Sequence, residues 1–366
     1  MRVLHVLGGL NRGGAETFVL NLYRAIDRDK IQFDFIIHTD KRQDYSEEIE
    51  SLGGKIYVFP KFNGKNYFKV KKCWNEFFAC HTEYKVLHSH VRSYASIYIP
   101  IAKKHGLKTI IHSHSTNDGG GISGAIKRLM EFPLRYQADY LFACSHEAGE
   151  WLYGKKACRK SNFYFIPNAI DTDKYEFNEQ VREEYRSEFA LQGKFVIGHV
   201  GRFSKPKNHT FLIDVFNLVC KERNDAVLLL VGDGELKERI TEKVVRLGLQ
   251  DRVIFTGSRG DVANLLQAMD VFVFPSLWEG LPVPVVEAQA SGLPCIISDV
   301  ITTDVDVSDL IERVTEYKPE NWSEKINSCR IERKNVIKEI KSACFDVNDS
   351  AKNLSDFYTS VGGGDV

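Results

Sequence analysis

Two glutamates, Glu279 and Glu287, lie eight positions apart in a stretch that follows a short apolar run. Glu279 falls in a turn that contains Gly and Pro, and Glu287 falls in an expected helix at 285–291. A strand end beside a helix N-terminus presents backbone N–H groups that attract phosphates. Since a carboxylate repels an anion, the glutamates themselves are suited to accept hydrogen bonds from neutral hydroxyls. The stretch therefore predicts a site for a polyhydroxy ligand that carries phosphate, such as a nucleotide sugar.

A pair of carboxylates can also cleave a glycosidic bond, with one residue as a proton donor and the other as a nucleophile. That chemistry needs one glutamate to stay protonated. A nearby helix N-terminus stabilises the ionised form instead. We therefore favour binding of hydroxyls over hydrolysis for Glu279 and Glu287.

Basic residues follow another expected strand, at 195–200, in a loop that precedes a helix. Arg202 can grip phosphate oxygens with two N–H groups, and Lys207 adds a compact positive charge. Together they could neutralise a diphosphate leaving group. Lys205 competes with Lys207 for this role, and a solvated basic loop is the alternative interpretation.

The first expected strand, 3–7, runs into a glycine-rich loop that includes Gly13 and Gly14. Glycines let the backbone approach a ligand closely at the start of a helix. Their spacing does not fit the dinucleotide-binding pattern G-x-G-x-x-G, which argues against a dinucleotide site.

Histidines mark the end of the expected strand 109–112. His112 and His114 are two positions apart, so on a strand they point to the same side. A metal site is one interpretation, but no third ligand at a suitable spacing is evident in the sequence. Two acidic D-x-D stretches, 171–173 and 304–306, resemble a metal-binding motif, and we interpret both as unrelated to function.

Short apolar runs alternate with amphipathic segments along the whole chain, which favours parallel sheets covered by helices. One series of strands ends near residue 166 and a second begins at 195. The length of 366 residues also suggests two domains. We therefore predict an α/β fold with two Rossmann-like domains, 1–175 and 176–346, and a final helix within 347–362.

These motifs, in this order, resemble those of the retaining glycosyltransferases of family 4, including bacterial exopolysaccharide and capsule enzymes. The stretch from Glu279 to Glu287 resembles their glutamate-x7-glutamate motif, and the likeness covers nearly the whole chain. The resemblance implies the GT-B architecture, in which two domains face a cleft. It also implies that the C-terminal helix crosses back to the first domain, which binds the acceptor.

The resemblance also assigns roles to individual residues. Glu279, with the backbone at Gly280 and Leu281, would hold the transferred sugar, and Glu287 would accept hydrogen bonds from ribose hydroxyls. The remaining implied contacts are divided between catalysis and donor binding. Catalytic contacts come from His114, Arg202 and Lys207, and donor contacts come from Gly13, Gly14, Ser258 and Arg259. His114 is preferred to His112 because it lies later, at the loop.

The implied reaction transfers a hexose or N-acetylhexosamine from a nucleotide diphosphate sugar, most often a UDP-sugar, with retention. No covalent nucleophile is evident, so the departing phosphate would take the acceptor's proton. We expect no cofactor and no metal, because two basic side chains already neutralise the diphosphate. The alternatives are a sugar-nucleotide epimerase of the same fold and a non-catalytic protein that binds sugar nucleotides or glycans.

Composition bears on partners and location. The net charge is zero and no nucleic-acid-binding module is recognisable, which excludes nucleic acid as an expected partner. Residues 51–75 hold six lysines and no acid, interleaved with aromatics, and 122–136 also mixes apolar and basic residues. Such surfaces dock on anionic lipid. We expect a cytoplasmic protein, peripheral on the inner membrane face, with reduced cysteines and a lipid-linked saccharide acceptor.

Overall fold

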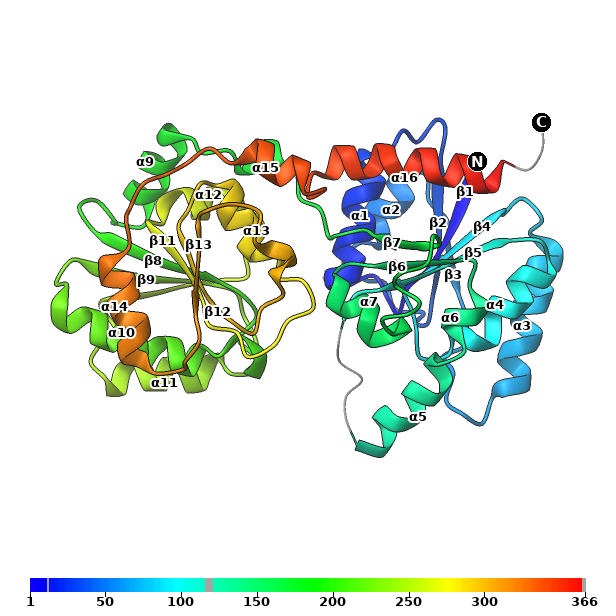
Figure 1. Cartoon of the computed structure of the whole chain (residues 1–366), viewed down its shortest axis with the longest axis horizontal. Coiled ribbons are helices and arrows are strands. Elements are labelled where there is room, and N and C mark those ends of the chain that lie inside the picture. The colour runs from blue at the N-terminus through cyan, green and yellow to red at the C-terminus, as the bar shows by residue number, and fades with distance from the viewer. Residues whose placement is uncertain (12, 116–120, 364–366) are drawn as a thin grey trace. The chain divides into compact units, whose positions relative to one another are not determined.

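A computed structural model describes residues 1–11, 13–115 and 121–363, without the side chains of 121–123. The chain forms two compact units, each with its own parallel sheet (Figure 1). The first unit contains Met1–Ala169 and the segment from Asp346 onward, and the second contains Ile170–Phe345. The structure therefore divides the chain after Ala169, whereas the sequence placed the division after residue 175.

The first unit has a seven-stranded sheet in the order β3-β2-β1-β4-β5-β6-β7, with every pairing parallel. Its strands are β1 Arg2–Val6, β2 Gln32–Ile37, β3 Ile56–Val58, β4 Val86–Ser89, β5 Lys108–Ser113, β6 Tyr140–Ala143 and β7 Phe163–Phe165. Its helices are α1 Gly14–Ala25, α2 Ser46–Ser51, α3 Tyr67–Cys80, α4 Ala95–Lys104, α5 Gly121–Glu131, α6 Leu134–Gln137, α7 His146–Tyr153 and α16 Val347–Gly362.

The second unit repeats this topology with six parallel strands in the order β10-β9-β8-β11-β12-β13. The strands are β8 Phe195–Val200, β9 Ala226–Val231, β10 Val253–Gly257, β11 Val271–Phe274, β12 Cys295–Ser298 and β13 Ile311–Val314. The helices are α8 Thr172–Tyr175, α9 Glu179–Glu188, α10 His209–Glu222, α11 Lys237–Arg246, α12 Val262–Ala268, α13 Val283–Ala290, α14 Pro319–Ser328 and α15 Ile337–Ser342. Two short 3-10 helices, Lys205–Lys207 and Thr303–Val305, complete it.

Each sheet reverses its strand order once, between β1 and β4 in the first unit and between β8 and β11 in the second. Ligands of open α/β sheets bind beside the carboxyl ends of the strands at such a reversal. The loops that follow β1, β4, β8 and β11 are therefore the places to search for a site in each unit.

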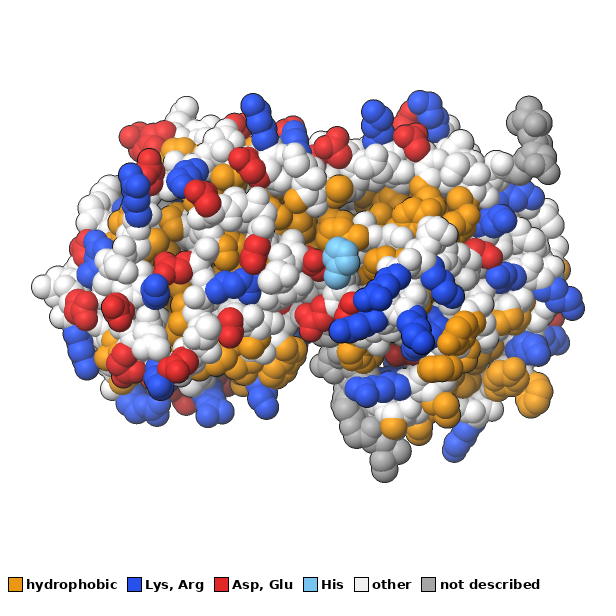
Figure 2. All heavy atoms as spheres, in the orientation of Figure 1, with side chains coloured by type: hydrophobic (Ala, Val, Ile, Leu, Met, Phe, Trp, Pro, Cys, Tyr) orange, Lys and Arg blue, Asp and Glu red, His pale blue; other side chains and the backbone are white. Residues whose placement is uncertain are grey.

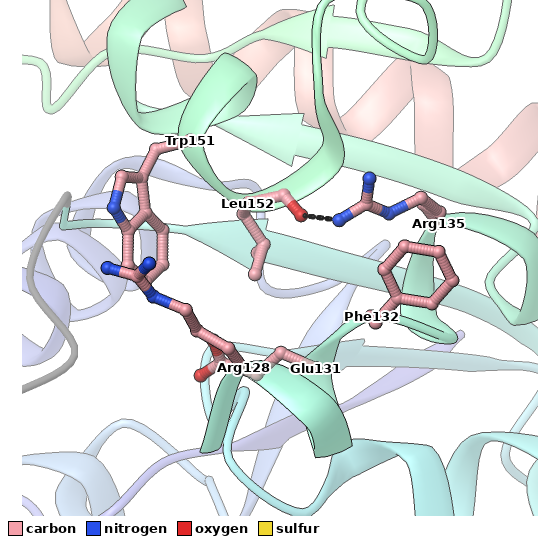
Figure 3. A pocket seen from close by; sticks show the side chains of 6 residues that line it. All are labelled: Arg128, Glu131, Phe132, Arg135, Trp151 and Leu152. Atoms are coloured by element: carbon pink, nitrogen blue, oxygen red, sulfur yellow. Dashed lines mark hydrogen bonds between the residues drawn. The ribbon is translucent and has the colours of Figure 1, made fainter. Parts of the chain in front are cut away.

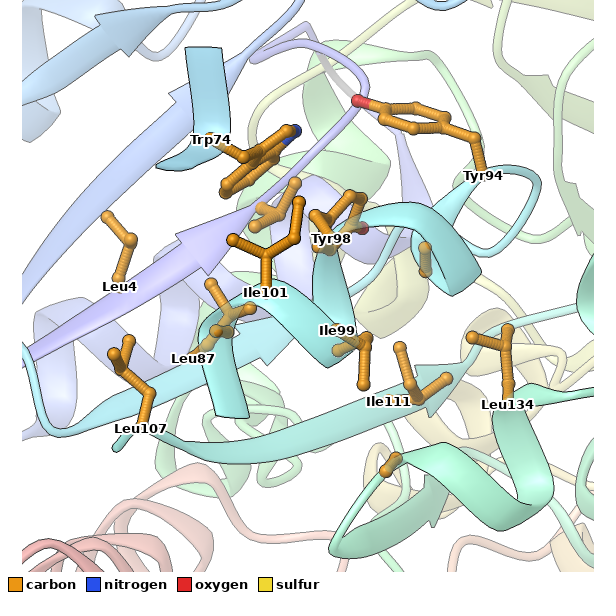
Figure 4. Packing of buried hydrophobic residues seen from close by; sticks show 14 of the residues in the cluster. Leu4, Trp74, Leu87, Tyr94, Tyr98, Ile99, Ile101, Leu107, Ile111 and Leu134 are labelled. Atoms are coloured by element: carbon orange, nitrogen blue, oxygen red, sulfur yellow. The ribbon is translucent and has the colours of Figure 1, made fainter. Parts of the chain in front are cut away.

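Apolar cores cover both faces of the first sheet. On one face, Trp74 of α3 stacks on Tyr98 of α4 with ring centroids 4.3 Å apart (Figure 4). On the other, α16 packs beside α1, and the buried Leu354 and Tyr358 belong to the same core. The side chain of Asp346 caps α16 by accepting from the backbone N–H groups of Asn348 and Asp349. The C-terminal helix is therefore part of the first unit.

Candidate functional site

A partly buried ion pair lies where the second sheet reverses its strand order. Lys207, just before α10, places its Nζ 2.7 Å from Oε1 of Glu279, which follows β11. Their side chains are only 16% and 14% exposed, and the Lys207 ammonium also lies 4.6 Å from the centroid of the Phe274 ring. The backbone links the same two loops, because Leu277 N–H donates to the carbonyl of Pro206. Two loops separated by about 70 residues in sequence therefore form one polar site.

Local backbone geometry explains why Lys207, and not Lys205, reaches Glu279. Lys205–Lys207 forms a 3-10 turn, and Asn208 then adopts a left-handed conformation with φ of 55° before α10 begins. Lys205 is exposed at the outside of this turn. Asn tolerates positive φ better than most residues, so it suits this junction.

Backbone donors lie beside the ion pair. Within the described part of the chain, the N–H groups of Glu279, Gly280 and Leu281 donate to no protein oxygen. They precede α13, which begins at Val283 with Pro282 as its N-cap and no side-chain cap. Unpaired N–H groups at a helix start are suited to bind anionic or hydroxyl oxygens.

Glu287 lies inside α13, and its Oε1 accepts a hydrogen bond of 2.6 Å from the hydroxyl of Tyr175. Burial raises the pKa of Glu287, while the Tyr175 hydrogen bond acts in the opposite direction. Burial and the nearby Glu287 carboxylate also raise the pKa of Tyr175, so its hydroxyl stays protonated and donates. Sequence reasoning missed Tyr175, because a lone tyrosine in a linking segment carries no signal.

Arg202 is far more exposed than Lys207. Its side chain is 74% exposed and lies 3.2 Å from Oε2 of Glu235. The loop beneath it is closely packed, since a Cβ on Gly232 would overlap the backbone of Gly201. Arg202 therefore lies at the surface above a tightly packed loop, where its guanidinium can change partners.

The loop after β10 contains the predicted Ser258 and Arg259. Ser258 is exposed, and Arg259 makes a double hydrogen bond to Asp261, at 2.8 and 2.6 Å. This partner lowers the pKa of Asp261 to about 2. The guanidinium of Arg259 is thus engaged within its own loop.

In the first unit, the predicted glycines lie at the start of α1. Gly13 is the N-cap and accepts from Thr17 N–H, and Gly14 has open space where a Cβ would be. Arg12, in the same loop, lies outside the described residues. No described side chain therefore covers the start of α1 at Gly14.

His114 follows β5 and belongs to a group of five histidines with His5, His88, His90 and His112. Its Nε2 lies 2.8 Å from Nδ1 of His90. Sequence reasoning found no third partner for His112 and His114, yet the order His-Ser-His occurs both at 88–90 and at 112–114. That repeat, on two neighbouring strands, was the available signal.

The two D-x-D stretches are engaged with basic side chains. Asp171 and Asp173 pair with Lys174 and Lys341, and Asp306 pairs with Arg313. Both stretches therefore take part in ion pairs within the second unit.

A separate cavity of about 270 Å³ lies in the first unit between α5, α6 and α7 (Figure 3). The Arg128 guanidinium lies 5.7 Å from the centroid of the Trp151 ring, and Arg135 donates to the carbonyl of Leu152. Phe132 stacks beneath Arg135 at 4.5 Å. The cavity is thus lined by arginines that stack on aromatic rings.

Comparison with known proteins identifies the family of the chain. Residues 12–174 match the model of Glycosyltransferase Family 4, and 181–341 match that of Glycosyl transferases group 1. The two parallel-sheet units have the GT-B fold of solved glycosyltransferase structures. The chain belongs to the group 1 and family 4 glycosyltransferases.

Individual relatives support this assignment. The putative glycosyltransferase EpsF of Bacillus subtilis is 36% identical over 332 residues, covering 89% of this chain and 86% of EpsF. An Escherichia coli UDP-Gal:alpha-D-GlcNAc-diphosphoundecaprenol alpha-1,3-galactosyltransferase is 36% identical over 141 residues, or 37% of this chain and 36% of that protein. The structure of Anabaena Alr3699/HepE with UDP-glucose has a TM-score of 0.78 at 19% identity, covering 98% and 100% of the two chains.

Proposed function

We propose that this enzyme transfers a hexose or N-acetylhexosamine from a UDP-sugar to a lipid-linked saccharide, with retention, in cell-surface polysaccharide assembly. The observation that carries the proposal is the Lys207–Glu279 pair beside the backbone N–H groups of residues 279–281, which donate to no oxygen of the described residues. A cation, a carboxylate and free N–H groups on one strand edge match a ligand with both phosphate and hydroxyl oxygens. The UDP-glucose complex of HepE, a protein of the same fold, supports the choice of donor.

The donor diphosphate would be bound by Lys207 and Arg202. When a diphosphate arrives, its charge competes with Glu279 for Lys207 and with Glu235 for Arg202. Both cations would then stabilise the negative charge that develops on the leaving group. Glu279, released from Lys207, would accept hydrogen bonds from sugar hydroxyls. No metal is needed for this charge balance, so we expect turnover to be insensitive to EDTA.

Glu287 would bind the ribose. Tyr175 already donates to Oε1 of Glu287, which leaves Oε2 as the acceptor for a ribose hydroxyl. Tyr175 also fixes the carboxylate orientation before the ligand binds, which lowers the entropy cost of binding. Ser258 and Arg259 would line the base, with Arg259 oriented by Asp261.

The reaction would proceed without a covalent intermediate. The acceptor hydroxyl would attack the sugar from the side of the departing diphosphate, and a phosphate oxygen would take its proton. The first unit would supply the acceptor site, the glycine loop at Gly13 and Gly14, and His114 as a contact for the transferred sugar.

We further propose that the first unit binds the inner membrane surface from the cytoplasm through a face formed by α3, α5 and α6. Large apolar side chains protrude there: Phe68 is 83% exposed and Leu129 is 76% exposed. Figure 2 shows apolar and basic side chains gathered over these helices. Lys69, Lys71 and Lys72 lie on the same helix as Phe68. No described helix is long and apolar enough to span a bilayer, and a basic–apolar face of this kind binds anionic lipid surfaces.

Nucleotide binding tests the donor site. Calorimetry of UDP-, GDP-, ADP- and dTDP-sugars should show one preferred nucleotide, with affinity at least tenfold lower in Glu287→Ala and Lys207→Ala. Glu312→Ala, a partly exposed glutamate on β13, is the matched control and should bind normally. Binding that is equal in all variants would refute the assignment.

Product analysis then separates the alternatives. Release of free sugar with UDP, in the absence of a glycoside product, would identify a sugar-nucleotide epimerase. Binding without turnover on any acceptor pool would identify a non-catalytic binding protein. A new glycoside bond with a retained anomeric configuration is the expected result.

Vesicle flotation tests the membrane face. The protein should float with vesicles that contain anionic lipid and not with neutral ones, and Phe68→Ser combined with Leu129→Ser should abolish flotation. Val245→Ser removes a comparably exposed apolar side chain, 59% exposed in the second unit, and should have no effect. Equal flotation of all variants would show that this face does not bind lipid.

A further inference from the structure

Five histidines lie together on one side of the first sheet. His5 lies on β1 in register with His88 on β4, and His112 lies on β5, while His90 and His114 follow the ends of those last two strands. Positions two apart on a strand share a face, so the histidines form a continuous layer. Phe18 of α1 and Tyr358 of α16 contact this layer. His5, His88 and His112 are completely buried.

Hydrogen bonds divide the layer into two chains. In one, His5 Nδ1 lies 3.1 Å from His90 Nε2, and His90 Nδ1 lies 2.8 Å from His114 Nε2. In the other, the Tyr358 hydroxyl lies 2.6 Å from His88 Nδ1, and His88 Nε2 lies 3.3 Å from His112 Nδ1. The first chain ends at the predicted catalytic His114, whereas the second begins at the C-terminal helix.

Two groups of three histidines have nitrogens close enough to bind one metal ion. One is His5, His88 and His90, and the other is His90, His112 and His114. The ring orientations oppose this interpretation. His112 and His114 are stacked, with centroids 4.0 Å apart and planes inclined by 29°. An imidazole lone pair lies in the plane of its ring, so stacked rings direct their lone pairs alongside each other. Bonds of about 2.0 Å to one ion need converging lone pairs.

Burial keeps all five imidazoles neutral. It lowers the pKa of His5 and of His114 to about 3, and it lowers the pKa of His88, His90 and His112 well below the usual value. A neutral imidazole carries one N–H and one lone pair, so each hydrogen bond fixes which nitrogen bears the proton. The proton arrangement of each chain therefore follows from its ends.

In the chain that starts at Tyr358, the hydroxyl is the donor, because no other acceptor for it lies among the described residues. His88 must then accept at Nδ1 and carry its proton on Nε2, which donates to His112 Nδ1. The proton of His112 is consequently on its Nε2. The Ile166 backbone raises the pKa of His112 by hydrogen bonding, but the buried Nε2 of His112 makes no hydrogen bond within the usual limits to any described residue.

The chain that ends at His114 has the opposite arrangement. His114 Nδ1 and Asn168 Oδ1 are both buried and make no hydrogen bond within the usual limits to any described residue, while Asn168 raises the pKa of His114 by hydrogen bonding. An N–H on His114 Nδ1 would satisfy that oxygen. His90 and His5 would then donate from Nδ1, leaving only a lone pair at the buried His5 Nε2. The reverse direction would leave a buried N–H there, and unpaired N–H groups are the rarer case in proteins.

We propose that His5 and His90 are positioning residues that hold the proton of His114 on Nδ1, toward Asn168, and so fix the orientation of the His114 ring at the end of β5. This inference rests on the proposed contact between His114 and the transferred sugar. With its lone pair occupied by the N–H of His90, His114 has no free basic nitrogen. It therefore cannot abstract a proton from the acceptor.

Nitrogen NMR tests the proton positions directly in the full-length protein labelled with ¹⁵N-histidine. His5, His90 and His114 should show pyrrole-type Nδ1 and pyridine-type Nε2 signals, and His88 and His112 the reverse. A pyridine-type Nδ1 on His114 would overturn the proposal. Added Zn²⁺ should leave all five signals unchanged, and a shift of all three signals of the group His90, His112 and His114 would establish the metal site instead.

Variants of His90 connect the tautomer to turnover. His90→Phe keeps the ring volume but removes the bond to His114, so the His114 signals should change and kcat should fall about fivefold to tenfold with UDP affinity unchanged. His90→Asn places an amide N–H near the Nδ1 position and should restore both. His88→Phe, an equally buried histidine in the other chain, is the matched control and should leave the His114 tautomer intact.

The outcomes separate this proposal from the proposed function. If His90→Phe changes the His114 tautomer but its kcat equals that of His88→Phe, the positioning role is wrong. If the wild-type protein turns over no nucleotide sugar, the proposed function fails and with it the role of His114, while the spectra still decide the proton positions.

Discussion

Mild acid should destabilise the first unit because its histidine layer cannot accept protons while folded. Desolvation by burial is the main cause that lowers the pKa of His5 and of His114 from 6.5 to about 3. The Asp34 carboxylate opposes the shift at His5, and Arg92 adds to it at His114. In the unfolded chain both imidazoles return to ordinary pKa values and bind protons below pH 6.5.

The size of the effect follows from this difference. The pKa of each histidine is lower in the folded state, so its stabilising contribution is complete above pH 6.5 and is lost as the pH falls toward 3. At pH 5 the loss is about 2 kcal/mol for each group, or about 4 kcal/mol for both. His88, His90 and His112 act in the same direction. Total stabilities of about 5–15 kcal/mol make this a large fraction.

Asp34 does not mask the effect in this pH window, whereas Glu16 opposes it, because burial raises the pKa of Glu16 and its protonation favours the folded state. The lowered pKa of Asp34, which accepts hydrogen bonds from Arg2 and Tyr84, causes a loss of stability only below its ordinary value of 3.8. Between pH 8 and pH 5 the titration of buried histidines therefore dominates the change in stability of this unit.

The change in the free energy of unfolding of the first unit can be measured by urea unfolding at pH 8 and at pH 5. Hydrogen-exchange pulse labelling at one fixed pH then reports unfolding through peptides of β1, β4 and β5. The midpoint should be lower at pH 5, and His5→Phe should reduce the difference between the two pH values by about 2 kcal/mol. His105→Gln changes an exposed histidine and should leave the difference as in the wild type. Equal midpoints at both pH values, or a difference that His5→Phe does not change, would refute the reasoning.

Two further predictions concern the second unit. Tyr175→Phe removes the donor to Glu287, so the nucleotide affinity measured by calorimetry should fall about fivefold. The fall should be larger at low pH, because burial raises the pKa of Glu287. Unchanged affinity would exclude a role for this pair. Gly232→Ala places a Cβ against the Gly201 carbonyl at a φ of 138°, and should lower the free energy of unfolding by about 3 kcal/mol or more in urea. Gly260→Ala, with open space and ordinary φ, should change it by less than about 0.5 kcal/mol.

The strands that are rich in apolar residues could be predicted from the sequence, because buried parallel strands are short apolar runs. β13, Ile311–Val314, was missed because its sequence IERV places two adjacent charged residues between two apolar ones, at the edge of the sheet. The periodicity of apolar residues also does not predict the order of the strands in a sheet. The reversal points between β1 and β4 and between β8 and β11 follow from crossover connections between distant segments.

The candidate site was predictable where the residue type itself suggests chemistry, as for Glu279 and Lys207. Their contact was not predictable, because it depends on how two loops far apart in sequence meet. Tyr175 contributes a single hydroxyl from a short helix and has no sequence pattern around it. His90 differs, since the order His-Ser-His is repeated at the ends of two successive apolar runs and so indicates a shared layer.

The two units use one topology with different chemistry at the strand ends. In the second unit the reversal point carries the charged groups Lys207, Glu279 and, nearby, Arg202, which can exchange partners with a diphosphate. In the first unit it carries glycines and neutral histidines such as His114, whose protons are fixed by hydrogen bonds. A neutral layer of this kind offers no positive charge that would attract a diphosphate. Of the two reversal points, the one in the second unit is therefore suited to bind a diphosphate.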